Sequence, residues 1–277
     1  RKVEGYKMKD LTFGQYYPSD SVVHRMDARV KILLMILYIA AIFFISSYFG
    51  YAVTLIFILA FSLVSKVPIT KILKSVKRIT VILVITALLN LFFVKTGKII
   101  AHWWIFTITD YGLNYAIMMA LRLTFLVIGT TFLTLTTTPT ERTDGLESLM
   151  TPLKYVKIPV HDIAVIMSIA LRFIPTLMEE TQKIMNAQKA RGATFDTGHL
   201  HQRAKALLPV LIPLFVNAFR RADELAFALD ARCYNATENR TKYKVQKIKF
   251  SDIVGILVVG GYLALVIVDK YVFWGLF

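Results

Sequence analysis

Residues 30–49 read VKILLMILYIAAIFFISSYF, and this stretch decides the fold class. Apart from Lys31, Ser46 and Ser47, its side chains are aliphatic or aromatic. An apolar run of about 18 residues or more is long enough to cross a bilayer as a helix. Similar runs lie at residues 51–64, 79–94, 116–138 and 253–268, and the shortest of them need flanking residues to span. The sequence therefore predicts an all-α polytopic membrane protein with about five transmembrane helices.

The overall composition supports this class. Of the 277 residues, 56% are hydrophobic and only 18% are charged. Soluble domains are typically about 45–50% apolar and about 25% charged. The apolar residues also fall in long blocks and not in short alternations. These properties exclude an ordinary soluble domain.

The net charge of +15 is distributed unevenly along the chain. Seven basic residues lie before or at the start of the first run, five lie between the second and third runs, and seventeen lie in residues 139–249. If five spans are threaded with the N-terminus inside, only Lys95, Lys98 and Lys270 fall outside. The positive-inside rule therefore predicts that the N-terminus and residues 139–249 are cytoplasmic and that the C-terminus is outside. Because topology accounts for the excess charge, we infer no nucleic-acid partner.

Residues 139–249 form the longest hydrophilic region, and two apolar stretches interrupt it. Residues 163–178 contain Arg172 and Pro175, and residues 206–218 contain Pro209 and Pro213. If both crossed the membrane, several basic residues between them would lie outside, against the charge rule. We therefore predict long amphipathic helices along the membrane face. This divides the chain into residues 1–138 with the first four spans, a cytoplasmic region at 139–249, and a last span at 250–277.

One apolar stripe in this region steps by three and four residues, which is helical periodicity. Its members are Leu208, Leu211, Phe215, Phe219, Ala222, Ala226 and Leu229. Such a stripe occurs on any core helix.

A short motif occurs twice, each time where an amphipathic helix is expected to end. The first copy is Ala190-Arg191-Gly192 and the second is Ala231-Arg232-Cys233. Gly192 can adopt the left-handed conformation that ends a helix. Each motif places one arginine between small neighbours, so an exposed guanidinium could enter a pocket on another protein. Two such arginines suggest a partner with two equivalent pockets.

No catalytic or cofactor-binding pattern is present in the sequence. There is no phosphate-binding Gly-x-x-x-x-Gly-Lys-Ser/Thr loop, so the chain is not expected to hydrolyse ATP by itself. The pair His199-x-His201 has no third ligand nearby, and we expect a solvated loop and no metal. Arg122 lies inside the fourth apolar run, where snorkelling to the membrane surface or pairing with another helix is a simpler role than transport. We expect no cofactor.

These residues resemble a known family, the transmembrane component of energy-coupling factor (ECF) transporters, which import vitamins and trace metals into prokaryotes. The likeness covers about residues 13–250. Near the N-terminus it rests on Gly14-Gln15-Tyr16, Pro18, Ser21, His24-Arg25, Asp27, Arg29 and Lys31. Further on it rests on Thr143-Asp144-Gly145-Leu146-Glu147, Leu171-Arg172-Phe173-Ile174-Pro175, Ala187-Gln188-Lys189-Ala190-Arg191-Gly192, Phe219-Arg220-Arg221-Ala222-Asp223-Glu224-Leu225-Ala226 and Asp230-Ala231-Arg232-Cys233. Ala28 stands where the family often has proline, and Cys233 where it has glycine.

The resemblance implies a non-catalytic subunit in a prokaryotic cell membrane. In that family the long cytoplasmic helices are coupling helices, whose two arginine motifs dock into a pair of ATP-binding-cassette (ABC) ATPases. The same helices contact a small membrane-embedded substrate-binding subunit. Carried onto this sequence, ATPase docking falls to Ala190, Arg191, Gly192, Ala231, Arg232 and Cys233. The stripe from Leu208 to Leu229 becomes the candidate contact with the binding subunit, or with the other coupling helix.

Two other functions remain open from the sequence. A multi-span membrane enzyme could place an active site in residues 139–249, using Glu179, Glu180, Asp223 and Glu224. Each of these pairs is adjacent in sequence, so the two carboxylates diverge on a helix. A self-contained permease is the other possibility, although no span carries the acidic or broken-helix pattern of a transporter's substrate site.

Overall fold

The computed structural model describes residues 16–94, 96–103, 106–152, 159–193, 195, 200–234 and 249–273. Over these residues the chain forms eight α-helices and one short β-hairpin. The elements are α1 (Ala28–Phe44), α2 (Tyr48–Ser65), α3 (Ile69–Phe93), β1 (Ile99–Trp103), β2 (Phe106–Thr109), α4 (Asp110–Thr136), α5 (Pro139–Met150), α6 (Val160–Ala190), α7 (Leu200–Ala231) and α8 (Phe250–Phe273). The predicted helical membrane fold is confirmed, and the hairpin is an addition to it.

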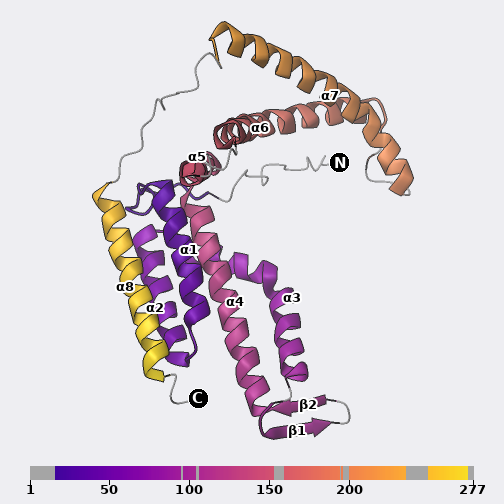
Figure 1. The fold of residues 1–277 in the computed structure, drawn as a ribbon. Coiled ribbons are helices and arrows are strands. Elements are labelled where there is room, and N and C mark those ends of the chain that lie inside the picture. Colours follow the sequence, from indigo (N-terminus) through magenta and orange to yellow (C-terminus); the bar gives the residue numbers. More distant parts are fainter. Residues whose placement is uncertain are drawn as a thin grey trace. The chain divides into compact units, whose positions relative to one another are not determined.

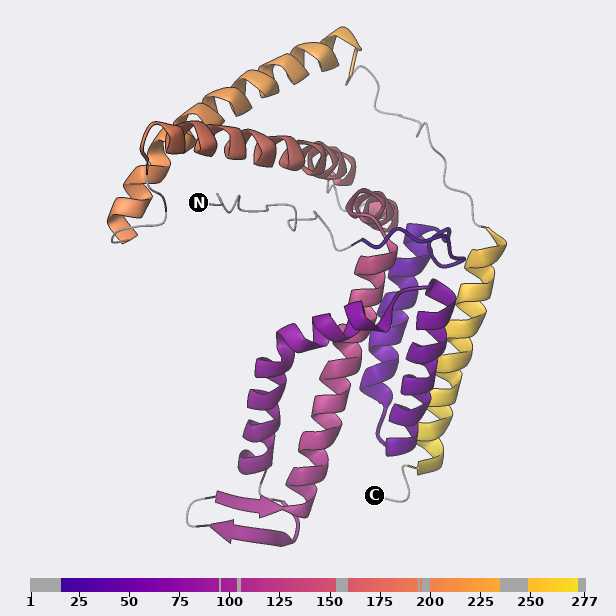
Figure 2. The same ribbon diagram turned by 180° about the vertical axis from the view of Figure 1, so that it is seen from behind.

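The chain divides into two compact units, which are described separately. The first comprises residues 1–161 and 247–277, and the second comprises residues 162–246. In the first unit α1, α2, α4 and α8 run side by side, and α3 returns along α4 (Figures 1 and 2). The unit boundaries place α5 with the bundle, where Gly145 brings the helix close to α1. A Cβ at this glycine would lie 3.1 Å from the Cβ of Ala28.

Five helices in the described residues are long and apolar enough to cross a membrane, namely α2, α3, α4, α6 and α8. The number agrees with the prediction, but one member differs. The run at 30–49 becomes a helix of only 17 residues, α1. It ends at Phe44 because Ser47 caps the next helix, its side chain accepting a hydrogen bond from Gly50 N at 3.1 Å. In place of α1, helix α6 is the fifth helix that is long and apolar enough to span. Its predicted position along the membrane face stays a prediction.

The hairpin joins α3 to α4 and was not predicted. Strands β1 and β2 are antiparallel, with Trp103 paired to Phe106. Thr109 ends the hairpin and caps α4: its hydroxyl accepts from Gly112 N and donates to Val94 O, both at 3.1 Å. One threonine thus connects the end of α3, the hairpin and the start of α4.

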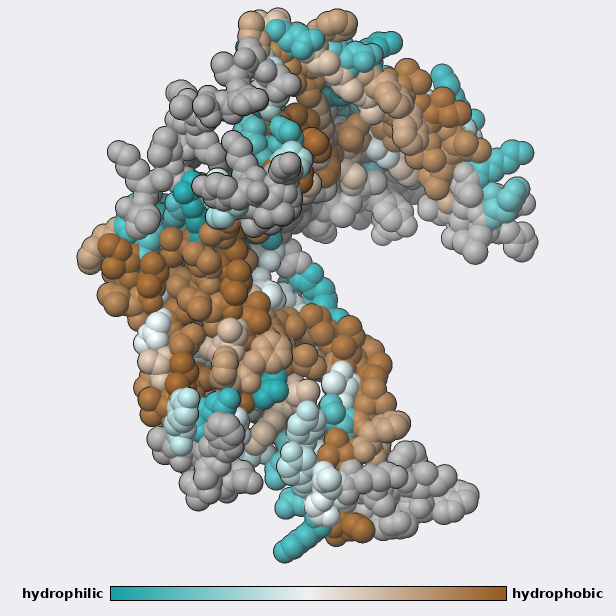
Figure 3. Space-filling model, viewed as in Figure 1, coloured by the Kyte–Doolittle hydropathy of each residue, from teal (hydrophilic) through white to brown (hydrophobic). Residues whose placement is uncertain are grey.

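The core of the first unit lies where α1, α2, α4 and α8 meet. The hydroxyl of Tyr38 donates to the carbonyl of Phe125 at 3.0 Å, and the rings of Phe57 and Tyr262 stack with centroids 4.5 Å apart. Gly129 allows α4 to approach Tyr38, because an added Cβ would lie 2.7 Å from Tyr38 Cδ1. On the outside, apolar side chains cover much of this unit in the view of Figure 3, as expected for helices that face lipid.

Of the N-terminal residues quoted for the family resemblance, Gly14 and Gln15 lie outside the described residues, and the segment from Tyr16 onward closes one end of this bundle. Tyr17 N donates to Leu135 O at 2.9 Å, and buried Lys31 donates to the carbonyls of His24 and Thr136 at 3.2 and 3.0 Å. The buried Asp252 of α8 accepts from Asp27 N at 2.9 Å and from Lys249 N at 2.7 Å. This part of the signature therefore has a structural role in joining the chain's N-terminal segment to α1, α4 and α8.

Arg122 pairs with the end of another helix, which is one of the two simpler roles that the sequence left open. Its guanidinium donates to the carbonyl of Ile45 at 3.0 Å. Ile45 is the residue that follows the last turn of α1, where carbonyl groups lack helical partners. The charge inside the fourth span thus satisfies the end of the first helix.

Candidate partner-docking site

The second unit contains the two long helices on which both arginine motifs lie. Helix α7 crosses α6 in Figures 1 and 2. Pro175 lies inside α6, and Pro209 and Pro213 lie inside α7. A proline within a helix removes a backbone hydrogen bond and favours a bend. Three prolines therefore shape the two helices whose ends carry the motifs.

Helix α6 ends at Ala190 in a complete Schellman motif. Gly192 N donates to Lys189 O at 3.0 Å, and Ala193 N donates to Gln188 O at 3.0 Å. Gly192 has a φ of +91°, the left-handed conformation that this motif requires. Arg191 is the C-cap residue and is exposed.

Helix α7 ends in the same way. Cys233 N donates to Asp230 O at 2.9 Å, and Tyr234 N donates to Leu229 O at 2.9 Å. Cys233 has a φ of +51°, so it takes the same left-handed place as Gly192 although it carries a side chain. Arg232 is the exposed C-cap residue. The replacement of glycine by cysteine in the second motif therefore leaves the cap intact.

The two predicted docking motifs thus share one local geometry. Each arginine stands at the C-cap of a long helix, next to an exposed alanine and a left-handed residue. A positive charge at this place interacts favourably with the partial negative charge of the helix C-terminus. The guanidinium has a planar fork of donors that suits carboxylates and carbonyls. Each helix end therefore offers a partner a fixed backbone and one exposed, charged side chain.

The apolar stripe of α7 lies on a different side from the contact with α6. Leu208, Leu211, Phe215 and Phe219 are 45–69% exposed. Ala222 and Ala226 are exposed too, and Leu229 is half-buried. The face of α7 that is least exposed instead carries Val210, Leu214, Asn217, Arg221 and Leu225. At about 100° per residue the two faces are centred about a third of a turn apart. The stripe is therefore neither a buried core nor the α6 contact, and it remains available to a partner.

Polar side chains connect α6 to α7 around Glu180. Glu180 of α6 accepts hydrogen bonds from the side-chain amide of Asn217 and from the guanidinium of Arg221, the latter at 3.4 Å. The sequence suggested Glu180 only as part of an alternative enzyme site and did not identify this contact. The repeated motif could have pointed to it, since Glu180 and Arg221 are separated by the same interval as the two motif arginines.

The described residues offer no obvious metal site. No group of three or more His, Cys, Asp or Glu side chains in that part of the chain could hold a metal ion. Of the pair considered for metal binding, His201 is exposed and His199 lies outside the described residues. Of the carboxylates considered for an enzyme site, Glu180 accepts a hydrogen bond from Arg221 of α7, while Glu179 is exposed.

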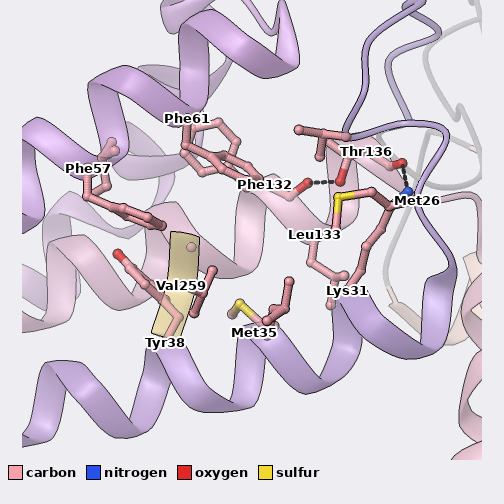
Figure 4. Close-up of a pocket in the computed structure, with 14 residues that line it drawn as sticks. Met26, Lys31, Met35, Tyr38, Phe57, Phe61, Phe132, Leu133, Thr136 and Val259 are labelled. Carbon is pink, nitrogen blue, oxygen red and sulfur yellow. Dashed lines mark hydrogen bonds between the residues drawn. The ribbon is translucent and has the colours of Figure 1, made fainter. Parts of the chain in front are cut away.

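A cavity of about 80 Å³ lies between α1, α2 and α4, and Val259 of α8 also lines it (Figure 4). Its lining is largely apolar, and includes Tyr38, Phe57, Phe61 and Phe132. The ammonium of Lys31 is turned to backbone carbonyls, one of which is that of Thr136. Sites for small organic ligands usually measure about 300–1,000 Å³, so we assign no substrate to this cavity.

Comparisons with known proteins place the chain in a family. The family model CbiQ, described as "Cobalt transport protein", matches residues 19–243. The chain is 49% identical over 253 residues to the energy-coupling factor transporter transmembrane protein EcfT of Clostridium kluyveri, covering 90% of this chain and 93% of the relative. It is 46% identical over 269 residues to the protein of that name from Ruminiclostridium cellulolyticum, covering 96% and 100%. For the Bacillus subtilis protein the identity is 45% over 237 residues, covering 86% and 89%. With its long apolar helices and its two arginine-capped helices, this chain belongs to the family of transmembrane components of energy-coupling factor transporters.

Proposed function

We propose that this chain is the membrane scaffold and energy-coupling subunit of an ATP-driven importer of a micronutrient, either a vitamin or a metal ion. The chain is a multi-pass membrane protein and a non-catalytic member of a transporter complex. The observation that supports the finer proposal is that both helix ends have the same cap geometry. Arg191 and Arg232 both stand exposed at the C-cap of a Schellman motif. Two equivalent docking elements on one chain suit two equivalent ATPase subunits.

The docking step follows from the chemistry of the two helix ends. Arg191 and Arg232 each enter a groove on one ABC-type ATPase and pair with carboxylates or backbone carbonyls there. Ala190, Gly192, Ala231 and Cys233 let the partner approach the helix end, because none carries a large side chain. Once one arginine has docked, the second arginine is held close to its own ATPase site, so that its effective concentration there is high. Both ATPases are then held by one rigid scaffold, and ATP hydrolysis takes place in them and not in this chain.

The apolar stripe supplies the second contact. Its exposed leucine and phenylalanine side chains lie outside the contact with α6 and form an apolar surface. An exposed apolar surface of this kind is typical of a protein interaction site. We assign it to a small membrane-embedded substrate-binding subunit. Movement of the ATPases is transmitted through α6 and α7 to that subunit, which releases its vitamin or metal ion into the cytoplasm.

Orientation follows from charge. The proposal places the N-terminus and residues 139–249 in the cytoplasm, where ATP is available, and the C-terminus outside, in the cell membrane of a prokaryote. The excess of basic residues in the predicted internal segments supports this arrangement.

Reconstitution separates this scaffold from a self-contained permease. The purified chain alone in liposomes should neither hydrolyse ATP nor accumulate vitamins or metal ions. Adding the two ATPases and a binding subunit should restore ATP-dependent uptake of that subunit's substrate. A matched liposome set without this chain controls for uptake by the binding subunit alone. Substrate accumulation by the lone chain would contradict the scaffold and favour the permease.

A further inference from the structure

The contact between α6 and α7 joins two equivalent positions of the repeated sequence. Glu180 and Arg221 are separated by 41 positions in the chain, and the same interval separates Arg191 from Arg232. Glu180 and Arg221 also touch each other, with 3.4 Å between Oε2 and the guanidinium nitrogen. Here two positions are called equivalent when they lie 41 residues apart, one on α6 and one on α7. If a two-fold axis relates the two helices, a residue can contact its own equivalent only where both lie at the axis. The ion pair is therefore the contact expected at an approximate two-fold axis between the helices.

The two arms that leave this crossing have equal length. Arg191 lies as many positions beyond Glu180 as Arg232 lies beyond Arg221. At a rise of 1.5 Å per residue each arm measures about 16–17 Å. Because this length is about three full turns of helix, each arginine also lies on nearly the same side of its helix as the crossing residue. Each arm ends in the same left-handed cap.

Burial along the helices is consistent with this axis. On α7 the least exposed face is formed by Val210, Leu214, Asn217, Arg221 and Leu225. The equivalent positions on α6 are half-buried in each case: Ile169, Phe173, Thr176, Glu180 and Ile184. Other positions of α6 are half-buried as well, and it is the ion pair that marks the crossing point. Asn217 adds a second donor to Glu180, where the equivalent residue on α6 is Thr176.

We propose that Glu180 is a positioning residue, whose contact with Arg221 on this axis sets the separation and direction of the two arginine ends. The axis relates Arg191 to Arg232, so the two ends fit a partner that is itself built with two-fold symmetry, namely a pair of related ATPase subunits. The inference has two halves. The partner half, that the two ends fit a pair of ATPases, rests on the proposed function. The geometric half, that Glu180 and Arg221 set the positions of the two ends, rests only on the contacts and spacings within the second unit.

Distance measurements between spin labels test the geometric half. Labels are attached after Ala187→Cys and Ala228→Cys, two exposed alanines at equivalent positions of the repeat, in a Cys233→Ser background of the full chain in nanodiscs. Glu180→Ala and Arg221→Ala should each at least double the width of the distance distribution or shift its maximum. The charge reversal Glu180→Arg with Arg221→Glu should restore the narrow distribution. Glu179→Ala and Arg220→Ala remove the same charges at adjacent exposed positions and should change nothing.

ATPase binding tests the partner half. Glu180→Ala should weaken the apparent affinity for the ATPase pair by about tenfold or more, because misplaced ends lose the gain from two-point attachment. In an Arg191→Ala background, where only one point remains, Glu180→Ala should add little further loss. An unchanged distance distribution in Glu180→Ala overturns the inference even if the arginines dock. Normal ATPase binding by the double variant Arg191→Ala with Arg232→Ala instead contradicts the docking proposal, and with it the partner half.

Discussion

At the scale of single residues, Cys233 holds a backbone conformation that residues other than glycine rarely adopt. Its φ of +51° places it in the left-handed region, where Gly192 stands in the first motif with a φ of +91°. A side chain in this region costs about 1–2 kcal/mol. The end of α7 therefore carries an unfavourable backbone free energy at Cys233. The end of α6 does not, because Gly192 takes this position there.

Replacing Cys233 by glycine should stabilise this cap. We expect Cys233→Gly to increase the local opening free energy of the last turn of α7 by about 1 kcal/mol, because the backbone cost is removed. Hydrogen exchange of the amides from Leu229 to Tyr234 measures this. Cys233→Ala retains a Cβ and should leave exchange close to that of the natural sequence. Equal protection in the glycine and alanine variants would contradict the strained cap.

A second residue-scale prediction concerns the close approach of α4 to α1. Gly129→Ala should lower the free energy of unfolding by about 1–3 kcal/mol, because the added methyl group would overlap the Tyr38 ring. Thermal or denaturant unfolding in detergent measures the change. Gly260→Ala on α8 is a suitable control, since nothing lies within 4 Å of the Cβ it would add. If both variants unfold alike, the helices do not pack as closely as described.

At the scale of elements, the N-terminal segment that closes the bundle contains a partly buried histidine, His24, with polar groups beside both ring nitrogens. Ser21 Oγ lies 2.7 Å from His24 Nδ1, and Nε2 lies 3.0 Å from Tyr17 O. The Tyr17 carbonyl can only accept, so Nε2 donates and Nδ1 accepts the Ser21 hydroxyl proton. Burial lowers the pKa of His24 below its usual 6.5, against the opposing effect of the Tyr17 carbonyl.

This lowered pKa predicts how stability changes with acidity. A histidine whose pKa is lower in the folded than in the unfolded chain favours unfolding when it gains a proton. Its stabilising contribution should be complete above a pH of 6.5, the unfolded value, and should be lost as the pH falls below it. Thermal unfolding in nanodiscs between about pH 7.5 and about pH 5 measures this. His24→Gln should flatten the pH dependence, and His201→Gln, at an exposed position, should not. An unchanged slope in His24→Gln would contradict the assignment.

The elements differ in how well sequence alone predicts them. The long apolar runs were predicted because hydropathy is a local property, but Ser47 shortened α1 by capping α2. Helix α3 begins at Ile69, well before its apolar run, because its lysine-rich first turns are amphipathic. The hairpin at residues 99–109 is too short for a periodic pattern. The arginine motifs were predicted to end helices from Gly192, whereas the Glu180–Arg221 contact depends on two segments meeting in space.

At the scale of the whole molecule, the proposed topology makes residues 139–249 cytoplasmic. A cysteine at position 239 should resist a membrane-impermeant thiol reagent in intact cells and react once the membrane is opened. A cysteine at position 98, in the predicted external segment, should react in intact cells. Both are introduced by Asn239→Cys and Lys98→Cys in a Cys233→Ser background, because Cys233 is exposed and would also react. Labelling at position 239 from outside would overturn the orientation.

Docking of two ATPases through Arg191 and Arg232 is the central claim for the whole molecule. Truncating a well-paired interfacial arginine typically costs about 2–4 kcal/mol, a loss of about 30- to 1000-fold in affinity. Each single alanine variant should therefore weaken ATPase association but leave some complex, since one attachment remains. Lysine at either position should restore little, because it keeps the charge and loses the planar fork.

The most direct measurement is co-purification of the four subunits with the double variant Arg191→Ala and Arg232→Ala, with substrate uptake assayed in parallel. We predict that the ATPases are lost while the binding subunit is retained by the exposed stripe of α7, and that uptake stops. Arg220→Ala, at an exposed arginine of α7 outside both motifs, is the matched control and should retain all subunits. Co-purification of both ATPases with the double variant, together with normal uptake, would contradict the account.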